Sequence, residues 1–281
     1  MNRMVLIGGI LLSALSLAAC GGGEADQPQP ADPAGTDAPG ADRGGETVDD
    51  DAAAGDQLAG DLTVFAAASL NIVFTDLAEV FTEQHPGARV TFSFAGSADL
   101  VAQLDAGAPA DVLATADEAT MAGAIEAGTI DAEPVIFAEN VLTLITPADN
   151  PGGVTGLDES LLGTDLVICA PQVPCGAATI ALADAMDVTL HPASEENNVT
   201  DVLGKVVSGQ ADAGLVYATE AHSAGEDVQV IEVPGAQDVV NRYPIAVTAG
   251  TDQPELAQAW VEFVTGPLAQ EALTAAGFRS P

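Results

Sequence analysis

The sequence of 281 residues predicts an α/β fold with largely parallel sheets. Apolar runs of strand length alternate along the chain with stretches whose apolar residues recur at helical spacing. Two of the predicted strand-to-helix junctions end in a serine, since residues 64–70 read VFAAASL and residues 92–100 read FSFAGSADL. The chain is long enough for two lobes of ordinary domain size, each with its own core.

The first sixty residues are predicted to belong to neither lobe. Residues 1–19 have the pattern of a secretory signal peptide, with an apolar stretch after Arg3 and Leu-Ala-Ala before Cys20. This ending resembles the lipobox of bacterial lipoproteins, which implies that Cys20 is lipidated; an ordinary signal peptide cut is the alternative. Residues 20–60 are rich in Gly, Ala, Asp and Pro, so we predict a disordered acidic tether.

Ser69 and Ser97 follow directly on two predicted strands and are predicted to be helix N-caps. Apolar residues recur at helical spacing after each of them. A helix start presents unpaired N–H groups and a partial positive charge, so two such starts can hold an anion without lysine or arginine. Each serine taken singly is weak evidence, because most N-cap serines only complete a helix.

The remaining elements follow from the same patterns. Short apolar runs predict strands at 90–94, 110–116, 140–145, 166–169, 213–217 and 243–247. Helical spacing predicts a helix from about 117 to 128, another at 199–207, and two closing helices, the first with Trp260 in the core. No run after residue 61 is long enough to span a membrane.

Acidic residues dominate the composition. The chain holds 42 acidic residues and 6 lysines and arginines, of which only Arg89, Lys205, Arg242 and Arg279 follow residue 60. This balance argues against nucleic acid or an anionic lipid surface as a partner. It does not argue against a buried anion site, because exposed charge is screened beyond about 8 Å at physiological salt, whereas donors inside a closed site act at contact distance.

Cys169 and Cys175 are predicted to form a disulfide, since the chain is predicted to be exported and two ligands are too few for a metal site. A pair of free buried thiols is the alternative. The C-x-x-C spacing of thiol oxidoreductases is absent. His85, His191 and His222 are scattered, without the spacing of a zinc site or a catalytic triad. We therefore expect a protein that is not an enzyme and has no cofactor.

Seven segments, in order, resemble the molybdate-binding protein of bacterial ABC importers: VFAAASL (64–70), FAGSADL (94–100), GAPADVLATAD (107–117), VPCG (173–176), NNV (197–199), ADAGLVY (211–217) and YPIAV (243–247). These proteins are type II periplasmic binding proteins. The resemblance therefore implies a two-lobed α/β fold with a ligand cleft between lobes joined by two chain crossings. It places lobe 1 at 61–140 plus 241–281 and lobe 2 at 141–240.

The resemblance also implies which residues bind the oxyanion. The family uses two serines, two main-chain N–H groups and a tyrosine, which correspond here to Ser69, Ser97, Cys175, Val199 and Tyr217. Cys175 replaces a more frequent alanine, which leaves its main-chain donor unaffected. Ala98 stands where relatives often have a further serine, and Thr200 where they often have an arginine.

The function that the resemblance implies is capture of molybdate, and we expect also tungstate, by a monomeric lipid-anchored receptor outside the cytoplasm that delivers the ion to an ABC permease. A receptor for sulfate or phosphate is the alternative. Neutral donors without acceptors would reject protonated anions such as hydrogen phosphate. A carboxylate receptor would use a bidentate arginine, which no candidate turn contains.

Overall fold

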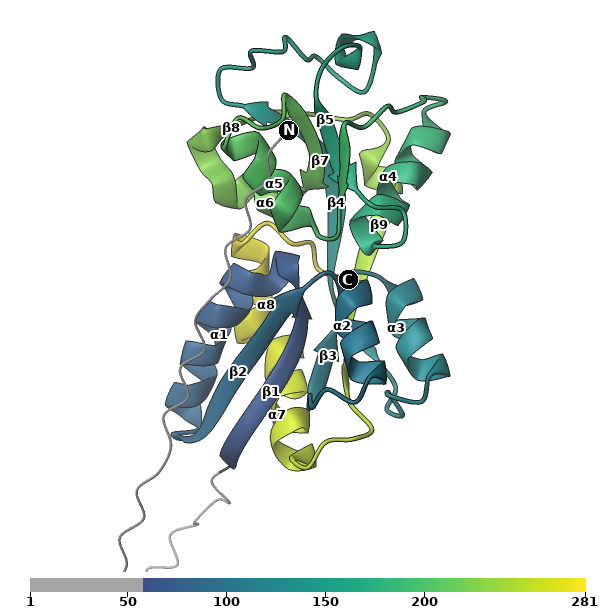
Figure 1. Cartoon of the computed structure of the whole chain (residues 1–281). Helices are drawn as coiled ribbons and strands as arrows, with labels where there is room; N and C mark the ends of the chain where they lie inside the picture. Colours follow the sequence, from purple (N-terminus) through teal and green to yellow (C-terminus); the bar gives the residue numbers. More distant parts are fainter. Residues whose placement is uncertain (1–57) are drawn as a thin grey trace, which may run out of the picture. The chain divides into compact units, whose positions relative to one another are not determined.

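The computed structural model describes residues 58–281, which form two α/β lobes (Figure 1). The predicted signal peptide, Cys20 and most of the predicted tether lie outside the described residues. Strand β1 (Ala59–Ala67) begins just before the predicted start of lobe 1. Among residues 58–281 no helix combines the length and the apolar character that crossing a bilayer requires.

The sheet of lobe 1 has the strand order β2-β1-β3-β9-β4. Strand β1 pairs in parallel with β2 (Gly87–Ala95) and β3 (Val112–Ala114), because helices connect these strands. The helices of this lobe are α1 (Asn71–Gln84), α2 (Ser97–Asp105), α3 (Glu118–Glu126), α7 (Pro254–Thr265) and α8 (Pro267–Ala275).

The sheet of lobe 2 has β7 (Ala213–Tyr217), β5 (Leu166–Cys169) and β6 (Ser194–Glu196) in parallel pairing, and β8 (Val228–Ile231) beside β4. Its helices are α4 (Pro174–Ala185), α5 (Val199–Val207) and α6 (Ala218–Ala224). Three short 3₁₀ turns complete the connections in this half: η2 (Glu159–Leu161), η3 (Gly225–Asp227) and η4 (Ala236–Asp238).

Two antiparallel strands, β4 (Val135–Pro147) and β9 (Val240–Val247), carry the chain from one lobe to the other (Figure 1). The first half of β4 pairs with β9, and its second half pairs with β7 and β8. The expectation of largely parallel sheets is therefore wrong for β4 and β9, because β9 pairs antiparallel with β3 and β4, and β4 also pairs antiparallel with β7 and β8. The two crossing strands are not linked to their neighbours by helical crossovers, and each runs antiparallel to the strand beside it: β9 to β3 in lobe 1 and β4 to β7 in lobe 2.

The core of lobe 1 is built around Trp260, which is fully buried as predicted. Its ring lies edge-on to those of Phe74 and Phe81, with centroids 5.7 and 5.2 Å apart. Helices α1 and α7 supply these rings and pack on the sheet that ends at the candidate site. The aromatic cluster thus fixes the helix that follows Ser69 against its strand.

Candidate functional site

A small cavity of about 20 Å³ lies between the lobes, where strands β1, β2 and β7 end and helices α2, α4 and α5 begin. Every residue that lines it in the described part of the chain is uncharged. The structure brings all of the predicted binding residues to its wall: Ser69, Ser97, Cys175, Val199 and Tyr217. A cavity of this size admits a compact solute of only a few atoms.

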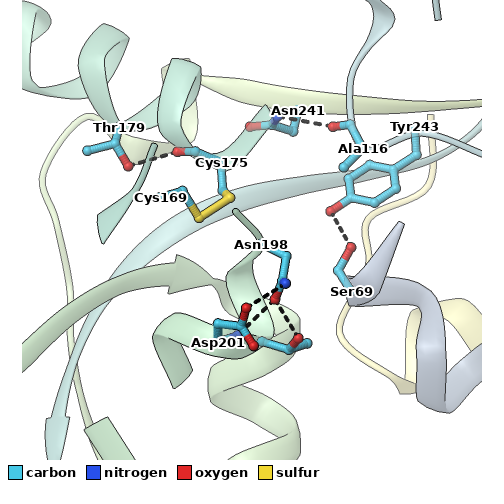
Figure 2. Close-up of a disulfide and its surroundings, with 10 residues drawn as sticks. Ser69, Ala116, Cys169, Cys175, Thr179, Asn198, Asp201, Asn241 and Tyr243 are labelled. Carbon is cyan, nitrogen blue, oxygen red and sulfur yellow. Dashed lines mark hydrogen bonds between the residues drawn. A yellow bond between two sulfur atoms is a disulfide. The ribbon is translucent and has the colours of Figure 1, made fainter. Parts of the chain in front are cut away.

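Ser69 lies inside a 3₁₀ turn, η1 (Ala68–Leu70), and its predicted role as an N-cap is wrong. The chain makes this extra turn between β1 and α1, so the cap positions fall on Ala67 and Leu70. The side chain of Ser69 contacts another residue instead. Its Oγ lies 3.0 Å from the hydroxyl oxygen of Tyr243, a residue of β9 (Figure 2).

Ser97 is the first residue of α2, and Gly96 occupies the cap position that the sequence assigned to the serine. Its Oγ accepts a hydrogen bond from the backbone N–H of Ala116 at 3.0 Å. The serine oxygen is the acceptor in this bond, so the hydroxyl hydrogen of Ser97 remains available to donate to another group. The N–H groups in the first turn of α2 have no carbonyl of their own helix to bind, so they add donors at the same place.

Lobe 2 contributes two further helix starts. Cys175 lies in the first turn of α4, after Val173 as the cap residue, and Val199 is the first residue of α5. The side chain of Asn198 caps α5 by accepting a hydrogen bond from the N–H of Asp201 at 2.9 Å (Figure 2). The N–H groups of Cys175 and Val199 donate to no other residue of the range 58–281. Three helix N-termini thus meet at one uncharged cavity, an arrangement that favours an anion.

Tyr217 ends β7, and its hydroxyl oxygen is buried without a hydrogen-bond partner among residues 58–281. The residue is 1% exposed. Burial raises the pKa of this phenol well above its usual value, so the group keeps its proton. A buried hydroxyl without a partner costs about 1–3 kcal/mol, which a hydrogen-bond acceptor in the cavity would recover.

A disulfide between Cys169 and Cys175 closes the loop that leads from β5 into α4 (Figure 2). The hydroxyl of Thr179 donates to the carbonyl of Cys175 at 2.8 Å, one turn along the helix. The backbone at Gly176 approaches so closely that an added Cβ would lie 1.8 Å from the carbonyl oxygen of Ala170. The loop and the glycine together hold the N–H of Cys175 in place beside the cavity.

Comparison with known proteins identifies the family. The model of the bacterial extracellular solute-binding proteins matches residues 62–279. The molybdate-binding protein ModA of Mycobacterium tuberculosis is 45% identical over 226 residues, which are 80% of this chain and 87% of the relative. ModA of Escherichia coli is 34% identical over 244 residues, which are 81% of this chain and 93% of the relative. The chain belongs to the bacterial extracellular solute-binding proteins.

Solved structures confirm the two-lobed type II periplasmic binding-protein fold for this solute-binding protein. The periplasmic molybdate-binding protein of Azotobacter vinelandii superposes with a TM-score of 0.66 at 24% identity, covering 78% of this chain and 99% of that chain. The sulfate-binding protein SubI of Mycobacterium tuberculosis superposes with a TM-score of 0.68 at 24% identity, covering 78% of this chain and 86% of that chain. The family consists of binding proteins and not of enzymes, as the sequence predicted.

Within residues 58–281 of this solute-binding protein, no lysine or arginine lines the cavity. Lys205 is paired with Glu196 in lobe 2, and Arg242 contacts Glu118 and Glu139 at 3.4 and 3.5 Å. Within residues 58–281 no cluster of three or more His, Cys, Asp or Glu side chains could hold a metal ion. The groups available to a solute in this cavity are therefore neutral dipoles.

Two residues that matter to the site were missed by the sequence analysis. Gly96 touches the other lobe so closely that an added Cβ would lie 2.2 Å from the carbonyl oxygen of Asn197. The lobes are thus in contact at this point, beside the cavity. Tyr243 reaches Ser69 across 174 positions of sequence. The YPIAV segment identified its strand, but no local pattern indicates a contact between residues so far apart.

Proposed function

We propose that this solute-binding protein captures molybdate, and also tungstate, between its lobes and delivers it to an ABC permease. The observation that supports this most is the uncharged cavity, to which both lobes bring neutral hydrogen-bond donors. The relatives named molybdate-binding proteins, at 45% and 34% identity, support the same ion. The metal oxyanion is the cargo, and binding it requires no resident cofactor.

The donors can account for tight binding. A hydrogen bond to a charged partner contributes about 1.5–3 kcal/mol, and nanomolar affinity requires about 12 kcal/mol. Two serine hydroxyls, the phenol of Tyr217 and the N–H groups at the starts of α2, α4 and α5 are sufficient in number. They also replace the water that a dianion loses when it enters a closed site.

The size of the site restricts the solute. The cavity of about 20 Å³ is small, which favours a small inorganic oxyanion over a larger organic anion such as an amino acid or a sugar phosphate. Sulfate is the second candidate, because it too is a compact tetrahedral dianion without a proton. Neutral donors serve both ions, so the choice between them depends on how closely the oxygen positions match the cavity.

Cellular placement is part of the proposal. The lipobox-like sequence before Cys20 supports a lipid anchor, and the tether predicted for residues 20–60 would connect it to the lobes. The family description, extracellular solute-binding protein, supports a location outside the cytoplasm. We propose that the receptor works there as a monomer.

Calorimetric titration of the protein with molybdate, tungstate, sulfate and phosphate tests the proposal. We expect molybdate and tungstate to bind with submicromolar dissociation constants and sulfate at least about a hundredfold more weakly. Binding should fall sharply in Ser69→Ala and persist in the double variant Cys169→Ala/Cys175→Ala. Tighter binding of sulfate than of molybdate would assign the second candidate, and no binding of any of these ions would refute the proposal.

A further inference from the structure

Both serines at the cavity have a hydrogen-bonding group behind them. The oxygen of Ser97 accepts from the backbone N–H of Ala116 at 3.0 Å. The oxygen of Ser69 lies 3.0 Å from the hydroxyl oxygen of Tyr243 (Figure 2). The group behind Ser97 can only donate, whereas the group behind Ser69 is a hydroxyl that could donate or accept.

The environment of Tyr243 decides the direction of its bond. The side chain is fully buried, and its hydroxyl lies 3.0 Å from the oxygen of Ser69, with the side chains of Asn140 and Tyr217 also near the phenol. Burial, together with the nearby carboxyl of Glu220, raises the pKa of the Tyr243 phenol far above its usual value. The phenol therefore keeps its proton at any physiological pH. When an anion occupies the cavity, Ser69 must give its own hydrogen to the anion, so Tyr243 must donate to Ser69.

We propose that Tyr243 is a positioning residue that donates to Ser69 and so directs the Ser69 hydroxyl hydrogen into the cavity, and that it thereby contributes to the rejection of protonated oxyanions. The inference rests on the proposed function. In the bound state the bonds form a chain, from the Tyr243 hydroxyl to the Ser69 oxygen and from the Ser69 hydroxyl to the anion. Each bond polarises the next, so the serine becomes a stronger donor than it would be alone.

The direction in which the Ser69 hydroxyl points affects which anions the cavity can bind. Hydrogen phosphate carries the same charge as sulfate but has one O–H group that needs an acceptor. With Tyr243 donating to Ser69 and Ala116 donating to Ser97 from behind, each serine turns its hydrogen toward the cavity, so the O–H of hydrogen phosphate meets a hydrogen there and not a lone pair. The unpaired O–H then costs about five- to a hundredfold in affinity. In Tyr243→Phe the hydroxyl of Ser69 is free to turn its hydrogen away from the cavity and to accept there, so this part of the discrimination is lost.

A double-mutant cycle distinguishes an effect of Tyr243 that acts through Ser69 from a nonspecific loss of structure. We expect Tyr243→Phe to weaken molybdate binding about three- to tenfold in the otherwise native protein. In the Ser69→Ala background the same change should have no effect, because the residue through which it acts is gone. Tyr217→Phe is the matched control. It removes a direct donor on the other lobe, so its loss of affinity should persist in the Ser69→Ala background.

Selectivity gives a second readout that a purely structural role would not change. The ratio of the phosphate to the molybdate dissociation constant, from competition titrations at pH 8, should fall at least threefold in Tyr243→Phe and not in Tyr217→Phe. An unchanged ratio, or a loss of affinity in Tyr243→Phe that persists in the Ser69→Ala background, would overturn the inference. Failure of the native protein to bind molybdate would instead refute the proposed function.

A spectroscopic measurement avoids changing Tyr243 at all. The chain contains two tyrosines, so Tyr217→Phe leaves Tyr243 as its single tyrosine. Saturating molybdate should then shift the near-ultraviolet tyrosine band, because the phenol becomes a fixed donor to Ser69. The shift should be absent when Ser69→Ala is added to Tyr217→Phe. A shift that persists without Ser69, or no shift in the single variant at saturation, would contradict the inference.

Discussion

Tyr217 lines the cavity, and its hydroxyl is buried without a hydrogen-bond partner among residues 58–281. Native proteins satisfy nearly all buried polar groups, so a group left in this way points to a missing acceptor. The burial that keeps the phenol protonated also strengthens any bond it makes, because the local dielectric is low. The unpaired hydroxyl of Tyr217 thus lowers the stability of the protein, and a solute that accepts its hydrogen bond would recover that free energy.

We predict that Tyr217→Phe lowers affinity for the oxyanion about tenfold or more while leaving the unfolding free energy of the ligand-free protein unchanged or raised. Affinity falls because a hydrogen bond to a charged acceptor is lost. Stability does not fall because the hydroxyl has no protein partner to lose. Calorimetric titration and denaturant unfolding measure the two quantities. A drop in stability with unchanged affinity would remove Tyr217 from the site.

Glu220 is a buried acid that the binding reaction does not use. It is 4% exposed, and burial raises its pKa to about 7. The hydroxyl of Thr219 donates to its Oε2 at 3.0 Å and partly opposes that shift. The amide of Asn140 in turn donates to Thr219 at 2.8 Å, which links α6 to the crossing strand β4. The carboxyl therefore lies where the two lobes are joined.

Glu220 should make stability fall as pH rises. The pKa is raised on folding, so the folded protein binds more protons than the unfolded chain between about pH 4.5 and 7. Its stabilising contribution is complete below that window and lost above it. Relative to Glu220→Gln, the native protein should lose about 3 kcal/mol of unfolding free energy between pH 4.5 and 8. Urea unfolding across this range measures the difference, with the exposed Glu226→Gln as control, and a parallel pH profile for the Glu220 variant would contradict it.

Local motifs located the residues that line the cavity but not their hydrogen bonds. The five predicted positions followed from short segments at strand and helix ends, where the sequence determines the geometry. The predicted caps were each displaced because Gly96 and an additional 3₁₀ turn occupy the helix starts. Contacts such as that between Tyr243 and Ser69 join distant segments, so only the folded structure reveals them.

Among the elements, helix α4 depends most on a covalent constraint. Its first turn contains both Cys175 and the N–H group that faces the cavity, and the disulfide ties that turn to the end of β5. Pro174 at the helix start and Gly176 beside Ala170 limit the loop further. The loop is short, so the bridge removes little freedom from the unfolded chain.

Removing the disulfide should therefore have a modest effect. For a separation of 6 residues, loop closure contributes about 2 kcal/mol to the free energy of unfolding. The double variant Cys169→Ala/Cys175→Ala should lose about this amount and still bind the oxyanion, because the donor at position 175 is in the main chain. Denaturant unfolding and calorimetry provide the test. Abolished binding in a folded double variant would show that the thiols take part directly.

The elements with local signals were predicted well, and those defined by long-range pairing were not. Strands β5 and β7 have the predicted bounds, because each is a short buried run next to a helix. Strand β4 extends well before its predicted start at 140, since its first half pairs with β9, about a hundred residues later in the chain. Pairing between strands so far apart in sequence cannot be recognised from the spacing of apolar residues within either strand.

At the level of the whole molecule, the proposed function makes binding depend on closure of the lobes. The cavity is lined by Ser69 and Ser97 from lobe 1 and by Cys175, Val199 and Tyr217 from lobe 2, so under this proposal only a closed form brings all donors to the ligand. In the structure Gly96 lies against the carbonyl oxygen of Asn197, from which an added Cβ would be 2.2 Å away. A glycine at this position is thus a requirement of the closed state.

We predict that Gly96→Ala weakens oxyanion binding at least about tenfold without lowering the unfolding free energy of the ligand-free protein. The backbone at Gly96 has φ −59°, which alanine adopts without strain, so the added methyl group obstructs only the approach of the lobes. Small-angle scattering with and without ligand should show a reduced compaction. Gly123→Ala, where an added Cβ meets nothing within 4 Å, is the control. Native affinity in Gly96→Ala would contradict the account of closure.

The most direct measurement is a crystal structure of the protein grown with molybdate, with the anomalous signal of molybdenum recorded. We predict one molybdenum peak in the cavity between the lobes, with its oxygens within hydrogen-bond distance of Ser69, Ser97, Cys175, Val199 and Tyr217 and of no lysine or arginine. A cavity without that peak, or an anion held by basic side chains elsewhere, would contradict binding by neutral donors from both lobes.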